Sequence, residues 1–558
     1  MQAPLSPVPA PSSSRSFRRT ALAAVGLTAA ASLVAWHGST VTHHIATHYE
    51  KHRVLRQLQE IPSLKLHFHV KRDSMKIHTL SEFDVFANPV IGTLENDVKI
   101  MTYDGIAEFE DSGIKHKYIL ANGVAYHTTQ TAAAGVANEE VSCMNGNTVP
   151  PIHDMLNAIN DAQPATVAAD SPQQITCASG KLLKLNFAGD QYLLCPEPNA
   201  SGFTVFGTDF DIAVQFLNGA VDIPIPELSE AALSACESVP SFSVVQPSAF
   251  DLLSGAGKSV AGRMLQSTRP VVVPSATCGC KGKRRPCIFF HGLNQKVEGP
   301  LSDSSTYFGK LGASAPCCTS IKYAQIDTVN QGWNEDAIQK KVCDLSLSMS
   351  STSNAASKTI EDTIIVAHSM GNMMLAGAIA TGKCSLSSTS TWVALASPTR
   401  GSMGSDFLQN ACSGNGGLIS LIAPIIGQCP ANKATKALAY ESEKFADATL
   451  KAQYDAAQIA YAKNVGAAMC SDSYNGLSGG DQLTYRLGGT IINHKSRLND
   501  GIVEYQSCVA DLPTSNFKPT YESAFYTTKV NHMDMTFRNG DSMTNNQQKP
   551  VKWFECLL

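Results

Sequence analysis

The sequence predicts the α/β class, with a mostly parallel sheet flanked by helices in the C-terminal half. An antiparallel β-rich region and an N-terminal hydrophobic segment are expected to precede it. The length, 558 residues, exceeds one ordinary core. Through residues 64–216 apolar and polar residues alternate with a period of two, as in half-exposed strands. After residue 286, continuous apolar runs alternate with helix-forming sequence, which is typical of a parallel sheet buried on both faces.

Composition narrows the class of protein. Charged residues make up 16% of the chain and apolar residues 43%, which is a globular composition. The formal net charge of −4 gives no electrostatic footprint for nucleic acid, so we expect no nucleic-acid partner. The sixteen cysteines divide into four before residue 237 and twelve after residue 277. Because both numbers are even and no spacing is that of a structural zinc site, we expect disulfides closed within each half, formed in an oxidising compartment.

The N-terminus fits the secretory pathway. Residues 1–20 are basic, rich in Pro and Ser and free of acidic residues, and residues 21–36 are apolar. This order is the pattern of a signal anchor or a signal peptide. An uncleaved segment would give a single-pass type II membrane protein, and we favour it narrowly over a secreted form. A mitochondrial import sequence and a twin-arginine signal are weaker alternatives. The membrane is therefore an expected partner, reached through this segment and a stalk at residues 37–60.

Three further units follow the stalk. Residues 61–236 are predicted to form an antiparallel β-rich accessory domain, in which Asn122-Gly123 between two apolar runs indicates a tight hairpin. His67 and His69 share a strand face there, and we interpret them as surface residues. Residues 237–285, rich in Pro, Ser and Gly, predict a linker, and residues 286–558 the parallel-sheet domain. The sequence assigns no chemistry to the β-rich domain.

The segment that carries chemistry is residues 367–371, Ala-His-Ser-Met-Gly. It stands between an apolar strand and a helix rich in small residues. A serine on such a turn presents its Oγ at the sheet edge, and the amides of the following helix face a developing oxyanion. The turn is crowded and needs small residues on both sides, here Ala367 and Gly371. We therefore predict that Ser369 is a nucleophile and that Gly371 supports the turn.

This segment resembles the nucleophile elbow of the α/β-hydrolase superfamily, in particular of its lipases and esterases. The resemblance covers residues 286–558 only. Residues 289–294, Phe-Phe-His-Gly-Leu-Asn, resemble the oxyanion segment of the family. The resemblance implies an α/β-hydrolase fold for the C-terminal half and an oxyanion hole made by the amides of Leu293 and Met370. His291 and Gly292 would support that hole.

Two more segments complete the resemblance. Residues 499–503, Asn-Asp-Gly-Ile-Val, resemble the acid loop of the family, and residues 530–533, Val-Asn-His-Met, its histidine loop. The implied triad has the chain order Ser369, Asp500, His532. In it His532 moves the proton, while Asp500 orients the imidazole and stabilises its charged form.

Alternatives exist for the base and the acid. His494 could be the base, although it precedes Asp500 and would break the expected chain order. Asp500 could be an ordinary turn residue in Asn-Asp-Gly. Three other carboxylates could then be the acid, namely Asp511, Asp534 and Asp541.

Residues 403–485 are expected to form a helical cap or lid. Residues 417–426 are strongly apolar, and residues 433–469 predict a long Ala-rich amphipathic helix or helix pair. The resemblance implies that a segment in this place covers the site. We favour an ordinary cap over a mobile, lipid-activated lid.

These features predict a carboxylic ester hydrolase that acts through an acyl-enzyme on Ser369. Lipid esters are the expected substrates, and neither a metal nor an organic cofactor is required. An acyltransferase would use the same residues and is the first alternative. A non-catalytic adhesion or scaffold protein is the second. The sequence specifies neither the acyl length nor any protein partner.

Overall fold

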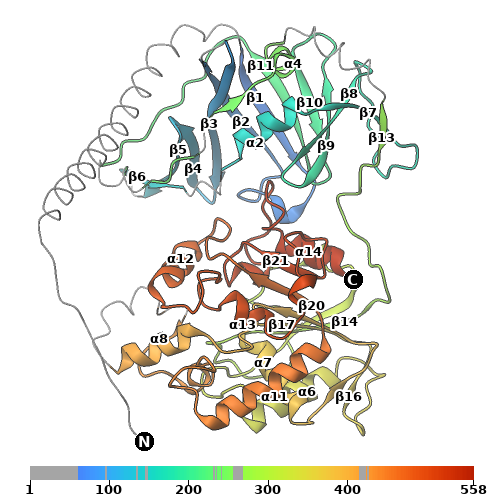
Figure 1. Ribbon diagram of the computed structural model, residues 1–558, viewed down its shortest axis with the longest axis vertical. Coiled ribbons are helices and arrows are strands. Elements are labelled where there is room, and N and C mark those ends of the chain that lie inside the picture. The colour runs from blue at the N-terminus through green and yellow to red at the C-terminus, as the bar shows by residue number, and fades with distance from the viewer. Residues whose placement is uncertain are drawn as a thin grey trace, which may run out of the picture.

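The computed structural model contains two large sheets in separate parts of the molecule (Figure 1). It describes residues 61–558 except for 95–96, 134–135, 145–148, 230–232, 234–235, 240–241, 256–267, 414–422 and 424–425. The predicted basic N-region, hydrophobic segment and stalk, residues 1–60, lie outside the described residues. Within the described part of the chain, no helix combines the length and the apolarity that a membrane span requires.

The first sheet has thirteen strands, twelve of which follow the order β13-β7-β8-β9-β10-β11-β1-β2-β3-β4-β5-β6 while β12 pairs with β3. All its pairings are antiparallel except that between β13 and β7. Helices α2 (Ile152–Asn160) and α4 (Pro247–Leu253) contribute side chains to its core. The strands are β1 (Ser63–Val70), β2 (Glu82–Thr93), β3 (Lys99–Asp111), β4 (Ile114–Ala121), β5 (Val124–Ala133), β6 (Val136–Cys143), β7 (Gln163–Val167), β8 (Leu182–Phe187), β9 (Asp190–Pro196), β10 (Gly202–Phe206), β11 (Phe210–Leu217), β12 (Ser243–Val244) and β13 (Arg269–Val271).

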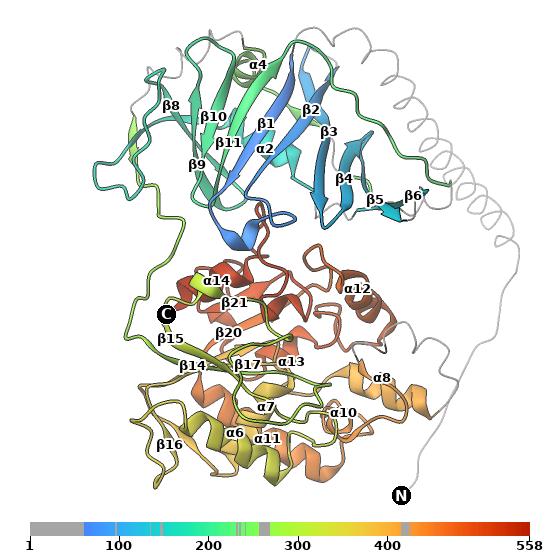
Figure 2. The ribbon, with the colours of Figure 1, turned by 180° about the vertical axis from the view of Figure 1, so that it is seen from behind.

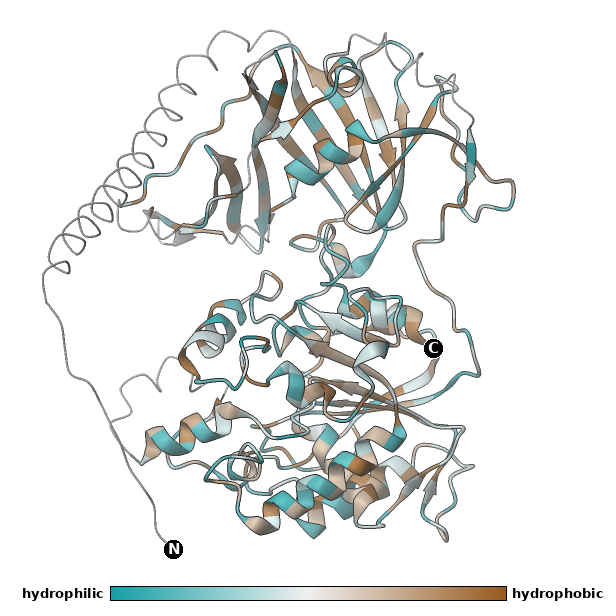
Figure 3. Ribbon diagram, in the orientation of Figure 1, coloured by the Kyte–Doolittle hydropathy of each residue, from teal (hydrophilic) through white to brown (hydrophobic). Residues whose placement is uncertain are grey.

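The period of two in the sequence explains this sheet. Side chains alternate between its two faces, and Figure 3 shows the matching alternation of hydrophobic and hydrophilic residues along its strands. Asn122 and Gly123, with φ of 53° and 73°, connect β4 to β5 in the predicted tight hairpin. Residues 237–285, predicted as a linker, contribute β12, α4 and β13 to this part of the molecule.

The second sheet is fully parallel, with six strands in the order β15-β14-β17-β19-β20-β21. Helices α6 (Asp336–Leu347), α7 (Met370–Ala380) and α11 (Ala448–Asn464) pack on one face. The other face packs against α14 (Pro550–Leu557) and the loops around it. A small separate sheet is formed by β16 (Thr359–Ile360) and β18 (Ser385–Leu386). The strands of the six-stranded sheet are β14 (Arg285–Phe290), β15 (Cys318–Tyr323), β17 (Ile364–His368), β19 (Thr391–Leu395), β20 (Val465–Ser471) and β21 (Phe525–Thr528).

The predicted fold class is wrong for this chain. The largest unit is the nearly all-antiparallel sheet, and helices make up a minority of the described residues. The prediction rested mainly on the C-terminal motifs. The first sheet is instead built from strands that lie between residues 63 and 271, outside those motifs. A six-stranded parallel sheet is shared by many unrelated folds, so the α/β-hydrolase fold expected for residues 286–558 does not follow from it.

The predicted helical cap at residues 403–485 also needs correction. This range does contain the helices α8 (Met403–Cys412), α10 (Lys433–Lys436) and the start of α12 (Gln482–Ile491). However, α11 packs against α7 beside the sheet, and β20 lies between β19 and β21 inside it. Ala467 and Ala468 are good helix formers, but their neighbouring strands place them in a buried strand. Residues 417–426, the apolar part of the expected cap, lie mostly outside the described residues.

All sixteen cysteines form disulfides, and none of the eight joins the first four cysteines to the last twelve. Eight disulfides indicate a secretory-pathway or extracellular protein. The pairs are Cys143–Cys236, Cys177–Cys195, Cys278–Cys556, Cys280–Cys317, Cys287–Cys318, Cys343–Cys384, Cys412–Cys429 and Cys470–Cys508.

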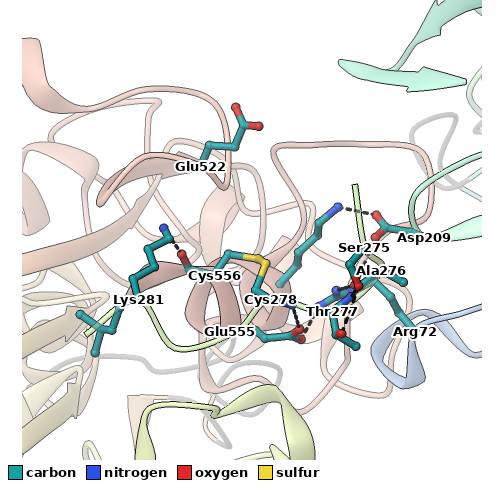
Figure 4. Close-up of a disulfide and its surroundings, with 12 residues drawn as sticks. Arg72, Asp209, Ser275, Ala276, Thr277, Cys278, Lys281, Glu522, Glu555 and Cys556 are labelled. Carbon is teal, nitrogen blue, oxygen red and sulfur yellow. Dashed lines mark hydrogen bonds and ion pairs between the residues drawn. A yellow bond between two sulfur atoms is a disulfide. The ribbon is translucent and has the colours of Figure 1, made fainter. Parts of the chain in front are cut away.

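The two parts meet through buried charges near the C-terminus. The disulfide Cys278–Cys556 ties the chain that leaves the first part to α14, as Figure 4 shows. Next to it, Arg72 of the first part donates to Glu555 of α14 at 2.6 Å. Figure 2 shows from behind that the segment after β1 lies against the C-terminal elements. The second part is therefore anchored to the first by covalent and ionic contacts.

Candidate active site

Ser369 lies on a sharp turn between β17 and α7. Its backbone has φ 53° and ψ −128°, a conformation that non-glycine residues rarely adopt and that costs about 1–3 kcal/mol. The turn crosses β14 closely, because a Cβ on Gly371 would lie 2.7 Å from the carbonyl oxygen of Phe290. A larger residue at position 371 could not fit there. The crowding expected from the sequence is therefore present around Ser369.

The segment that follows β14 lies directly against Ser369. A Cβ on Gly292 would stand 2.7 Å from Ser369 Cβ and 2.5 Å from the Tyr307 hydroxyl oxygen. The Gly292 carbonyl is fixed by two donors, Thr328 Oγ1 at 2.8 Å and His291 Nδ1 at 2.9 Å. The Ile326 amide donates to His291 Nε2, and burial lowers the pKa of His291 to about 4. His291 is thus a neutral, fixed side chain that supports the loop.

Asp500 and His532 form a buried pair. His532 Nδ1 and Asp500 Oδ2 are 2.7 Å apart, and the His532 amide donates to the Asp500 carbonyl at 2.9 Å. The other carboxylate oxygen, Oδ1, accepts from the amides of Ile502 at 3.0 Å and Val503 at 2.7 Å. Because a carboxylate accepts the Nδ1 proton, the free Nε2 of a neutral His532 is a proton acceptor.

A second histidine holds the backbone of the His532 loop. His368 Nε2 lies 2.9 Å from the His532 carbonyl oxygen, and its Nδ1 lies 2.7 Å from the Tyr307 hydroxyl. A carbonyl can only accept, so Nε2 carries the proton and Tyr307 donates to Nδ1. Burial, followed by the nearby His532, holds the pKa of His368 well below its ordinary value. The neutral His368 therefore links the Ser369 turn, Tyr307 and the His532 loop.

Ser369 and His532 line one pocket of about 220 Å³, and Leu293 lines it too. Met370 is the first residue of α7, at the helix end where amides have no intrahelical partners. Ser369, Asp500 and His532 are 6%, 2% and 5% exposed, so the group is shielded from bulk water. A serine on a strained turn and an imidazole that contacts a carboxylate lie in one pocket, an arrangement that can support acyl transfer.

The alternative residues lie in other contacts of the described structure. His494 pairs with Glu504 at 2.6 Å, and Asp511 pairs with Arg400 at 2.8 Å. Asp534 accepts from the amides of Leu477 and Asn531, which shapes the loop around His532. Asp541 accepts from Ser74 and from the first amides of α14. Only Asp500, among the carboxylates considered, contacts the His532 imidazole.

Sequence reasoning missed the residues that support the site from a distance. Tyr307 and Thr328 stand in loops without any motif, and nothing in the sequence marks them. Asn372 does have a local signal, because it follows the elbow. Its Nδ2 donates to the carbonyls of Ala367 and Leu395 at 2.9 Å each, which joins α7 to the ends of two strands.

The described residues contain no group of three or more His, Cys, Asp or Glu side chains arranged to hold a metal ion.

No protein-family model matches the chain. No curated protein matches it either. Among solved structures, a metagenomic carboxyl esterase is similar over 52% of this chain and 80% of its own, with 13% identity and a TM-score of 0.28. LprF from Mycobacterium bovis is similar over 32% of this chain and 97% of its own, with 9% identity and a TM-score of 0.17. With TM-scores this low, the function must be argued from the geometry of the site.

Proposed function

We propose that this chain is a serine hydrolase that cleaves carboxylic esters through an acyl-enzyme on Ser369. The observation that supports it most is the buried Asp500–His532 pair, which lies in the pocket that Ser369 lines from a strained turn. A strained nucleophile turn beside an oriented histidine has a cost in stability that a purely structural role does not explain. This favours a catalyst over the scaffold alternative.

The proposed reaction has two steps. His532 Nε2 removes the Ser369 proton while Oγ attacks the ester carbonyl, and the same nitrogen then protonates the leaving alcohol. In the second step water attacks the acyl-enzyme, with His532 again as base. Asp500 stabilises the imidazolium in both steps, and the amides of Leu293 and Met370 donate to the oxyanion. An alcohol in place of water would give acyl transfer with the same groups.

The test is covalent labelling and ester hydrolysis. The wild type should react with a fluorophosphonate probe and hydrolyse p-nitrophenyl butyrate, and Ser369→Ala should lose the label and at least about 10³-fold of the rate. Asp500→Asn should keep the fold and lose about 10⁴-fold of kcat, because the imidazole tautomer is no longer fixed. Ser348→Ala, at an exposed serine after α6, is the matched control and should behave as the wild type. An unlabelled, inactive wild type would favour the scaffold alternative.

A further inference from the structure

One hydroxyl in the pocket lacks a partner. Thr435 belongs to α10, lines the pocket of Ser369 and is 1% exposed. Its amide bonds to Asn432 Oδ1 at 2.7 Å, and its carbonyl accepts from Ser405 Oγ at 2.5 Å. Its own Oγ1 has no hydrogen-bond partner among the described residues. A buried polar atom without a partner is costly, and the described residues supply none for this hydroxyl.

A small recess opens beside this hydroxyl. Gly427 has φ 101° and no side chain, and a Cβ built on it would lie 3.7 Å from Thr435 Oγ1 and 3.8 Å from Asn294 Oδ1. Thr435 Oγ1 and Asn294 Oδ1 therefore both lie within 4 Å of the position that a side chain on Gly427 would take. Both also line the pocket of Ser369. The recess offers one hydroxyl donor and one amide oxygen acceptor.

The remaining walls limit the size and set the orientation of a substrate. Ile426, Leu438 and Ile502 supply apolar surface. The volume of about 220 Å³ lies below the roughly 300–1,000 Å³ typical of pockets for drug-sized ligands, which suits a short acyl group and not a long fatty chain. The leaving alcohol must lie near His532, which protonates it and against which the ring of Tyr485 stacks. Asn294 follows the proposed oxyanion residue Leu293 in the sequence. We therefore place the acyl group of the substrate on the side of the pocket that Asn294 lines.

We propose that the acyl group of the substrate is short and carries a hydroxyl that binds in this recess. The substrate hydroxyl would accept from Thr435 Oγ1 and donate to Asn294 Oδ1, so the buried Thr435 hydroxyl would gain the partner that it lacks. The inference rests on the proposed function and names the substrate class of the same site. A site with a buried hydrogen-bonding group discriminates against the analogue that lacks the matching group.

The experiment compares p-nitrophenyl 3-hydroxybutyrate, butyrate and palmitate. The wild type should show kcat/KM about tenfold higher for the hydroxylated ester than for butyrate, and lowest for palmitate. Thr435→Val, which keeps the shape and removes the hydroxyl, should bring the ratio of the two short esters close to one. Thr435→Ser, which keeps the hydroxyl, should retain the preference and shows that the position tolerates substitution. Thr514→Val, at an exposed threonine far along the chain, should leave the ratio unchanged.

The outcomes separate this inference from the proposed function. Equal rates for both short esters, unaltered by Thr435→Val, would overturn the hydroxyl site while Ser369 labelling still supports the hydrolase. Palmitate as the best substrate would overturn the size limit. Absence of labelling and of any hydrolysis would overturn both proposals together.

Discussion

Gly292 lies against Ser369, the proposed nucleophile, and its missing side chain is what allows that approach. In Gly292→Ala the new methyl carbon would stand 2.7 Å from Ser369 Cβ and 2.5 Å from the Tyr307 hydroxyl oxygen. Both contacts are too short, so Ser369 or Tyr307 must move. A displacement of about 1 Å at a reacting group can lower the rate about 100-fold, and we expect kcat for p-nitrophenyl butyrate to fall by that order.

The matched control is Gly282→Ala, where a new Cβ meets no atom within 4 Å. It should retain wild-type kcat. Circular dichroism and a thermal melt should show that Gly292→Ala is still folded. Wild-type activity in folded Gly292→Ala would mean that the segment after β14 does not position Ser369.

At the residue scale, local motifs mark three residues that lie near one another, but they do not indicate the contacts that hold these residues in place. Ser369, Asp500 and His532 each stand in a short segment of characteristic sequence, and the structure places Ser369 and His532 in one pocket with Asp500 behind. The contacts of Tyr307 with His368 and of Thr328 with Gly292 join loops distant in the chain. No local pattern encodes such contacts, because they depend on how the sheet arranges the loops.

Two helices of the second part offer a comparison at the scale of elements. Ser402 caps α8 by accepting from the Gly404 amide, and Asp447 caps α11 by accepting from the Leu450 amide. Ser402 also donates to the carbonyl of Ile502, whose amide holds Asp500. Ser402→Ala and Asp447→Ala should each lower the free energy of unfolding by about 1 kcal/mol. Only Ser402→Ala should also lower kcat, because it alone loosens the Asp500 loop.

Urea unfolding gives the two stability changes, and ester hydrolysis at saturating substrate gives kcat. Equal kcat for the two variants would show that the Asp500 loop does not depend on the cap of α8. A loss of kcat in Asp447→Ala would instead point to a general effect of stability on activity.

The elements themselves were predictable where the hydrophobic period was clear. The alternating strands and the Asn122-Gly123 hairpin belong to this group. Prediction failed at β20, whose alanines favour a helix in isolation, since the neighbouring strands decide its conformation. It also failed for β12 and β13, which are too short to show a period and exist only because they pair with β3 and β7.

On the scale of the whole molecule, buried ion pairs bind the two parts to each other. Asp209 of the first part lies 2.6 Å from Lys552 Nζ and 3.3 Å from Lys549 Nζ of the second. Burial alone would raise the pKa of Asp209, but the charges of Lys549, Lys552 and Arg72 outweigh it and hold that pKa below its ordinary value. The carboxylate is therefore charged at neutral pH. The contact joins residues more than 300 positions apart in the sequence, so no local motif could have predicted it.

Asp209→Asn should consequently destabilise the second part, although the substituted residue belongs to the first. Removing one partner from a buried charge group costs about 3–5 kcal/mol. The described tryptophans, Trp333, Trp392 and Trp553, all lie in the second part, so their fluorescence reports its unfolding in urea. We expect the fluorescence and far-ultraviolet dichroism transitions to coincide and to shift together to lower urea. Lys283→Ala, which breaks a surface ion pair with Asp362, should leave both transitions almost unshifted, because such pairs contribute little to stability. An unshifted fluorescence transition in Asp209→Asn would mean that the two parts unfold independently.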